Sequence, residues 1–132
     1  MIPLCQAEGI AVIPWSPLAR GLLAGSRKTP DDKTPTVRAS SDDYAWSLYD
    51  QPGDAEVMRA CQDVAAGRGV QSAQVALAWL LSKPAVTAPI IGATKMSHLE
   101  TAIGSLGVKL SAEEIQKLEA PYRPHEVRGF EF

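Results

Sequence analysis

Two short runs of apolar residues stand out from longer stretches that have the periodicity of helices. Residues 10–15 and 86–91 are apolar on both faces, which is the pattern of strands buried in a parallel sheet. Pro89 lies inside the second run and cannot donate to a ladder, so one side of that strand should be unpaired there. Long crossovers separate the runs. We therefore expect two parallel strands side by side in an α/β unit.

The periodic stretches predict helices with recognisable ends. Residues 2–8 resemble the tail of a helix that Gly9 closes. Residues 54–67 and 71–83 predict two further helices, and the second is so apolar that it must be buried on most sides. Pro84 ends this apolar helix because a proline cannot continue the hydrogen-bond pattern.

Two patterns of the capping-box type mark the last helices of the chain. Ser97 and Glu100 fit the first pattern, although that helix can equally begin at Thr94. Ser111 and Glu114 fit a clearer one, in which each residue satisfies a backbone N–H of the first turn. We expect a short helix at each place.

Each predicted strand ends in a turn that opens a helical pattern. The two turns read Trp15-Ser16-Pro17-Leu18-Ala19-Arg20-Gly21 and Ile91-Gly92-Ala93-Thr94-Lys95. Ser16 can cap the first helix, with Pro17 at its first position, where a missing N–H costs nothing. Such turns present free backbone N–H groups and the positive end of a helix dipole. Both are therefore candidate anion sites, with nucleotide phosphates as the usual ligands.

Two stretches have no clear period. Residues 26–53 are rich in Ser, Asp, Pro and Lys, and their aromatic residues give the loop something to bury. A gap of this length fits a functional lid and a packed surface loop equally well. Residues 121–132 form a C-terminal tail with two prolines.

Composition and charge narrow the class of protein. Hydrophobic residues make up 45% of the 132 positions and charged residues 21%, as in ordinary globular domains. With a net charge of −2, the chain lacks the excess positive charge that is typical of proteins binding nucleic acid or an anionic membrane. No apolar run could span a bilayer, and the chain does not open with a signal peptide. Cys5 and Cys61 stand far apart, so we interpret both as buried thiols of a cytoplasmic protein.

Three segments together carry a family resemblance. Residues 10–25 (IAVIPWSPLARGLLAG) resemble the seventh strand and following loop of the aldo-keto reductase family, residues 74–81 its seventh helix, and residues 90–100 its eighth strand and phosphate loop. The segments follow one another in the family's order and spacing. The resemblance implies the C-terminal part of a (β/α)8 TIM barrel, strands seven and eight with flanking helices, incomplete as a barrel. Residues 1–132 are then a single partial domain.

The resemblance also implies an NADP(H) site, in which the first turn holds the nicotinamide end and the pyrophosphate. Trp15 matches the aromatic residue that stacks on the nicotinamide ring, although plain core packing is the alternative. Ser16, Leu18 and Gly21 match positions that hold the pyrophosphate. Arg20 adds charge there or is simply solvated.

The second turn matches the part of the family's site that holds the adenosine phosphate. Gly92 lets the backbone approach closely, Thr94 offers a hydroxyl and Lys95 a cation for the 2′-phosphate. His98 stands where the family usually has Gln or Arg beside adenine. The family's Glu-Asn pair that reads the adenine edge is replaced by Thr101 and Ala102, which puts adenine recognition in doubt.

The family's catalytic Asp, Tyr, Lys and His lie on its first four strands, and no position of this sequence matches them. The resemblance thus implies an oxidoreductase segment that is inactive alone and meets a small carbonyl substrate only in an intact barrel. Two alternatives remain: a non-catalytic structural remnant that self-associates through unpaired strands, and a nucleotide-sensing module.

Overall fold

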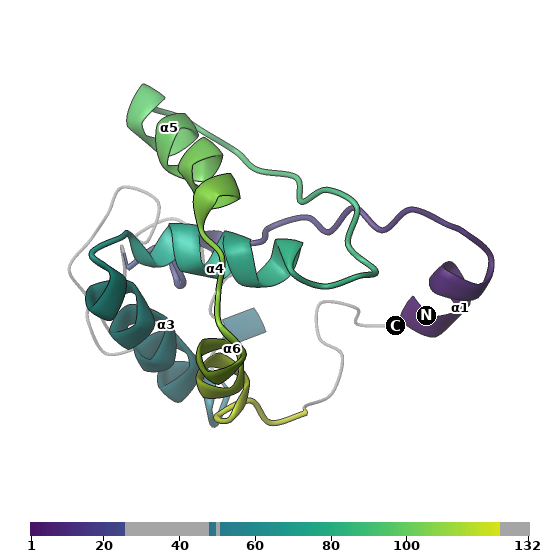
Figure 1. Ribbon diagram of the computed structural model, residues 1–132, viewed down its shortest axis with the longest axis horizontal. Coiled ribbons are helices and arrows are strands. Elements are labelled where there is room, and N and C mark those ends of the chain that lie inside the picture. Colours follow the sequence, from purple (N-terminus) through teal and green to yellow (C-terminus); the bar gives the residue numbers. More distant parts are fainter. Residues whose placement is uncertain (26–47, 50, 125–132) are drawn as a thin grey trace.

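The computed structural model describes residues 1–25, 48–49 and 51–124, and Figure 1 shows their arrangement. The central α4 is flanked by α3 and α6 on one side and by α5 on the other, while α1 lies at the far end of an extended segment. The described elements are α1 (Ile2–Ala7), the 3-10 helix η1 (Ala19–Gly21), α3 (Asp54–Arg68), α4 (Ser72–Leu81), α5 (Met96–Gly104), the 3-10 helix η2 (Ser105–Gly107) and α6 (Ala112–Glu119).

Helices α3 and α4 supply most of the core, as their apolar pattern predicts. The side chain of Val75 is 0% exposed and that of Leu77 is 2% exposed, so α4 is enclosed on most sides. Helix α3 ends at Gly69, whose φ of 66° is a left-handed conformation that favours glycine. The predicted bounds of both helices are confirmed to within two residues. The buried residues of the pair are Met58, Ala60, Cys61, Val64, Ala65, Ala73, Val75, Ala76, Leu77 and Ala78.

Helix α6 is joined to this core by charged contacts as well as by apolar packing. The predicted capping box at Ser111 and Glu114 is confirmed. Glu114 also accepts two hydrogen bonds from Arg68 of α3, at 2.5 and 2.6 Å. At the other end of α6, Glu119 accepts a 3.0 Å bond from the Trp79 indole and pairs with Lys83. These contacts fix both ends of α6 against the α3–α4 pair.

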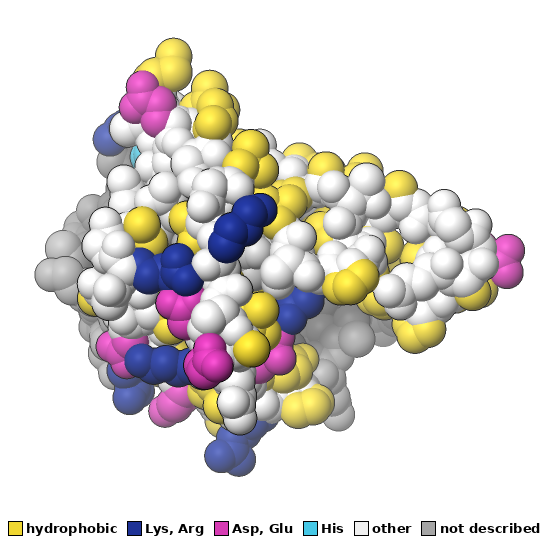
Figure 2. Space-filling view, viewed as in Figure 1, with side chains coloured by type: hydrophobic (Ala, Val, Ile, Leu, Met, Phe, Trp, Pro, Cys, Tyr) yellow, Lys and Arg dark blue, Asp and Glu magenta, His cyan; other side chains and the backbone are white. Residues whose placement is uncertain are grey.

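The two predicted strands are neighbours and parallel, but they do not form continuous strands. Within the described residues their pairing consists of two isolated parallel bridges, Val12 with Val86 and Trp15 with Ile90. Burial on both faces was also wrong. Figure 2 shows hydrophobic side chains in the open along this part of the molecule, and Ile13 is 57% exposed. Two segments cannot cover each other's faces, and Pro89 interrupts the ladder.

Two predicted helix starts are also corrected. Ser16 has a left-handed φ of 49° and does not cap a helix, because the chain makes tight turns and the short η1 instead. Helix α5 already begins after Lys95, so Ser97 lies inside it and no capping box forms there. The helix at the start of the chain and its closure by Gly9, with φ of 65°, are confirmed.

Some expectations concern residues outside the described part of the chain. Most of the predicted loop or lid at 26–53 (residues 26–47 and 50) and most of the tail at 121–132 (residues 125–132) fall there. Of the helices that the structure describes, none combines the length and apolarity needed to cross a membrane.

Candidate functional site

The two predicted anion-binding turns begin next to each other in the structure. Trp15 and Ile90 are paired as parallel neighbours, and the Ile90 amide donates to the Pro14 carbonyl at 2.9 Å. The first turn begins one residue after Trp15 and the second two residues after Ile90. The pairing therefore makes loop A (residues 16–21) and loop B (residues 92–95), about 75 positions apart in sequence, begin close to each other.

Loop A holds three non-glycine residues in the left-handed region of backbone space. The φ angles are 49° at Ser16, 47° at Ala19 and 53° at Arg20. Each such residue costs on the order of 1–3 kcal/mol, and conformations of this kind concentrate at functional sites. Gly21, with φ of 102°, is the one position of the turn suited to its conformation by residue type. Residue types gave no signal for Ala19, so its part in this geometry was missed.

Leucines within and directly after loop A hold it to the core, whereas Trp15, directly before the loop, stays exposed. Leu18 and Leu23 pack against the core cluster, and Leu22 is only 7% exposed. Trp15 is 62% exposed, so packing inside the chain does not account for its ring. Two tight turns shape the backbone, with Ala19 N–H donating to the Ser16 carbonyl and Gly21 N–H to that of Leu18, both at 2.9 Å.

Loop B is exposed along its whole length and leads directly into α5. Lys95 is the N-cap residue of that helix and has an extended backbone, and no side chain caps the first turn. The positive end of the α5 dipole therefore faces the same edge as the Lys95 ammonium. The Thr94 hydroxyl lies 3.5 Å from Nδ1 of His98, one turn further on. These groups present donors and positive charge to solvent together.

Gly92 in loop B is not required by the conformation of the chain. Its φ lies outside the left-handed region, and a methyl group built there would meet no atom within 4 Å. Glycine is otherwise kept where a backbone conformation or a close approach demands it. Open space beside Gly92 leaves room for a molecule to approach the backbone.

Of the two positions that depart from the family's adenine-reading pair, one is already hydrogen-bonded within the protein and the other has no polar side-chain atom. The Thr101 hydroxyl donates to the Ser97 carbonyl at 2.8 Å and lies 3.3 Å from Oε1 of Gln71, the N-cap residue of α4. Ala102 offers no side-chain hydrogen bond. Thr101 therefore ties α5 to α4 and is already engaged within the protein.

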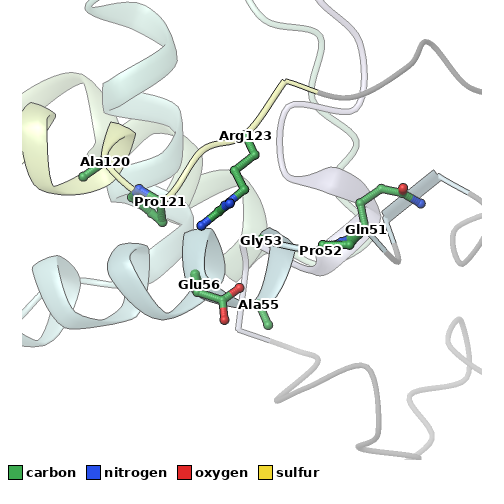
Figure 3. A pocket seen from close by; sticks show the side chains of 8 residues that line it. All are labelled: Gln51, Pro52, Gly53, Ala55, Glu56, Ala120, Pro121 and Arg123. Atoms are coloured by element: carbon green, nitrogen blue, oxygen red, sulfur yellow. The ribbon is translucent and has the colours of Figure 1, made fainter.

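A separate hollow of about 500 Å³ lies at the beginning of α3 (Figure 3). None of the nine predicted cofactor residues lines it. Its walls are Gln51, Pro52, Gly53, Ala55, Glu56, Ala120, Pro121 and Arg123. Open to solvent and without a cluster of catalytic groups, this hollow does not add to the site formed by loops A and B.

The described residues hold no group of three or more potential metal ligands. The predicted burial of both thiols is confirmed for Cys61 but was wrong for Cys5, which is only partly buried. Burial raises the pKa of Cys61 to about 11, partly offset by a backbone hydrogen bond from Ala76. Its thiol also donates to the Ser72 carbonyl at 3.4 Å. A thiol with so high a pKa stays protonated near neutrality and is a core residue rather than a nucleophile.

Comparison with known proteins gives relatives over nearly the whole chain. Versiconal hemiacetal acetate reductase of Aspergillus parasiticus is 39% identical over 127 residues, 94% of this chain and 36% of that protein. Aldo-keto reductase dtxS3 of Metarhizium robertsii is 38% identical over 128 residues, 95% of this chain and 33% of that protein. The chain thus spans about a third of the length of these relatives.

A solved structure agrees with these relatives. The crystal structure of the thermostable aldo-keto reductase Tm1743, in complex with the inhibitor epalrestat, superposes with a TM-score of 0.61 at 26% identity. The match covers 92% of this chain and 33% of that one. The model of the aldo/keto reductase family, in turn, matches residues 1–123. On this evidence, the chain belongs to the aldo/keto reductase family.

Proposed function

We propose that this chain is the NADP(H)-binding C-terminal segment of an aldo/keto reductase, a family of oxidoreductases. The observation that carries the proposal is the parallel pairing of Trp15 with Ile90, because loops A and B begin directly after these two paired residues. A dinucleotide has a nicotinamide end and an adenosine end, and two adjacent loops with separate chemistry suit its two ends.

Each loop offers groups that fit one part of the cofactor. The exposed Trp15 ring provides a flat surface for the nicotinamide, and Ser16 offers a hydroxyl for the pyrophosphate at the start of loop A. In loop B, Lys95 and the uncapped start of α5 provide positive charge for an adenosine phosphate. The open space beside Gly92 supports the same assignment.

The chemistry follows from the cofactor and is incomplete in this segment. When bound, NADPH supplies a hydride for the carbon of a small carbonyl substrate. Reduction of a carbonyl also needs a proton donor for the oxygen, worth roughly a hundredfold to ten-thousandfold in rate. No residue of this sequence matches the family's catalytic positions, so we propose that the segment binds cofactor but does not turn over alone.

The exposed apolar face is where the rest of the barrel would pack. We use this name for the exposed hydrophobic residues of the two extended segments, of α5 and of η2, which are Ile10, Ile13, Ile90, Ile91, Met96, Leu99, Ile103 and Leu106, all at least 38% exposed. Parallel strands in such barrels have neighbours on both edges and helices outside. The segment's two extended stretches lack a third neighbour within the described residues.

The same apolar face favours a second candidate, a non-catalytic role through self-association. Apolar patches of this kind are typical of interaction sites, and open strand edges pair readily with other chains. In this case the face would be covered by a second copy, and cofactor binding would not be needed.

Substitution of one cation tests the cofactor assignment. Lys95→Ala should weaken NADPH binding about 10- to 100-fold, the scale of roughly 1.5–3 kcal/mol for a hydrogen bond to a charged group. Binding of NADH, which lacks the 2′-phosphate, should hardly change. Isothermal titration calorimetry with both cofactors measures this difference. Lys117→Ala on α6 removes an equal charge from the same chain and serves as the matched control.

The pattern across the two cofactors decides between the candidates. Equal losses for NADPH and NADH would contradict the 2′-phosphate assignment of Lys95. Absence of binding of either cofactor to the unsubstituted chain would favour the structural role.

A further inference from the structure

Between two consecutive hydrogen bonds of the paired segments, residues 86–91 contain one residue more than residues 10–15. The Thr87 amide donates to the Val12 carbonyl at 2.9 Å, and the next such bond runs from Ile90 to Pro14, also at 2.9 Å. One segment advances two residues between these bonds, from 12 to 14, while the other advances three, from 87 to 90. A regular ladder advances equally on both sides, so this irregularity is a β-bulge.

Proline at two positions accounts for the bulge. After the bond from Thr87 to Val12, a regular parallel ladder would take its next donors from the amides of residues 14 and 89. Both residues are prolines and have no N–H. The Ile90 amide is the next donor along the chain, and it occupies the place that residue 89 would have in a regular ladder.

We propose that Pro14 and Pro89 set the register between the extended segments, and that Pro89 is thereby a positioning residue for loop B. This inference rests on the proposed cofactor site for its functional consequence. Without the bulge, residues after position 89 would move along the pairing by one residue, about 3.3 Å. A one-residue slip also turns each side chain to the opposite face.

Loop B cannot follow such a slip freely because α5 is fixed at its far end. Helix α5 packs closely on α4 at Gly104, where an added Cβ atom would lie 2.5 Å from Nε2 of Gln74. The Thr101 hydroxyl makes a second contact with α4 through Gln71. A change of register would therefore be absorbed in loop B, where Gly92 and Lys95 lie.

Pro89→Val restores an N–H group at the interrupted position and tests the proposal. In the 132-residue chain we expect the new amide to become protected from hydrogen exchange. The nuclear Overhauser contacts of Trp15 should move from Ile90 to residue 89, and the Kd for NADPH should rise at least tenfold. Pro84→Val is the matched control, because Pro84 is exposed and lies outside the pairing. It should leave the contacts and the Kd unchanged.

Deletion of Ala88 provides a second test that does not depend on the folding of the first variant. Removing one residue between Thr87 and Ile90 makes the two segments advance equally and leaves Pro89 where no donor is needed. We therefore expect the deletion to keep the Trp15–Ile90 contacts and to change the Kd for NADPH less than threefold.

The outcomes separate this inference from the proposed function. Trp15–Ile90 contacts that persist in Pro89→Val, or that are lost on deletion of Ala88, would overturn the register assignment. A changed register with unaltered NADPH affinity would overturn the positioning role. If the unsubstituted chain binds no NADPH while both variants pair as expected, the proposed function fails and the register assignment stands.

Discussion

The helical core and the region that carries loops A and B differ in how far their apolar side chains are buried by the rest of this chain. In the core, Val75 and Leu77 of α4 are almost completely enclosed by neighbours from this chain. In the other region, Ile13 and Ile90 are each more than half exposed. Figure 2 shows charged side chains gathered over α3 and α6, where Arg68 pairs with Glu114, and hydrophobic side chains exposed along the segments on the other side of α4.

This difference separates the residues that hold the chain together from those of the proposed site. The α3–α4–α6 group contains its own hydrophobic contacts, caps and ion pairs. The region that carries loops A and B contributes strained turns and open groups that add little to stability. A change in one region should therefore leave the property carried by the other almost untouched.

Truncation of one core residue should produce the largest effect. Leu77→Ala removes a side chain that is 2% exposed and should lower the free energy of unfolding by about 2–5 kcal/mol. Ile13→Ala, at a position 57% exposed, should lower it by less than about 1 kcal/mol. Urea denaturation followed by circular dichroism measures both. Losses of similar size would contradict the division into core and open face.

A charge placed on the open face should change association and leave stability almost unaltered. We expect the 132-residue chain to self-associate through its apolar face, and Ile13→Lys to shift it toward monomer in sedimentation velocity experiments. Tyr122→Lys is the control, since Tyr122 is 60% exposed but lies beyond α6. If both variants associate like the parent chain, the open face is not the contact surface.

Lowering the pH should reduce the stability of the core by protonating Glu114, with a smaller effect than the substitutions above. Its hydrogen bonds from Arg68, and then that from the Ser111 backbone, lower its pKa to about 2 from an ordinary value near 4.5. Because the folded pKa is the lower one, this stabilisation is fully present above about pH 4.5 and disappears as the pH falls to about 2. Urea midpoints of the parent and of Glu114→Gln should therefore converge by pH 2. A constant difference between them would contradict this role.

The same division explains what the sequence could predict. Helices α3 and α4 were predictable because their periodicity reflects burial within this chain, and the Ser111 capping box is a local signal. The strands were only partly predictable, since the apolar pattern of residues 10–15 reports burial that their neighbours in this chain do not supply. Their interruption depends on the alignment of Pro14 with Pro89, which a single segment does not reveal.

Loop A shows most clearly that residue types alone do not predict backbone conformation. Ser16 before Pro17 has the composition of a helix start, and a serine favours that position. The structure instead places Ser16 and Ala19 in left-handed conformations that neither residue favours. Tertiary contacts of the flanking leucines with the core override the local preference. The family pattern thus predicts which residues form the proposed site, but it did not predict the backbone geometry of loop A.

The most direct test of the central claim is a titration of the 15N-labelled chain with NADPH, followed by amide chemical shifts. The account predicts saturable shifts concentrated in residues 15–21 and 92–98, with the amides of α3 and α6 almost unmoved. Shifts concentrated instead around Gln51–Glu56 and Ala120–Arg123, the walls of the separate hollow, would contradict it. So would a spectrum that stays unchanged at millimolar NADPH.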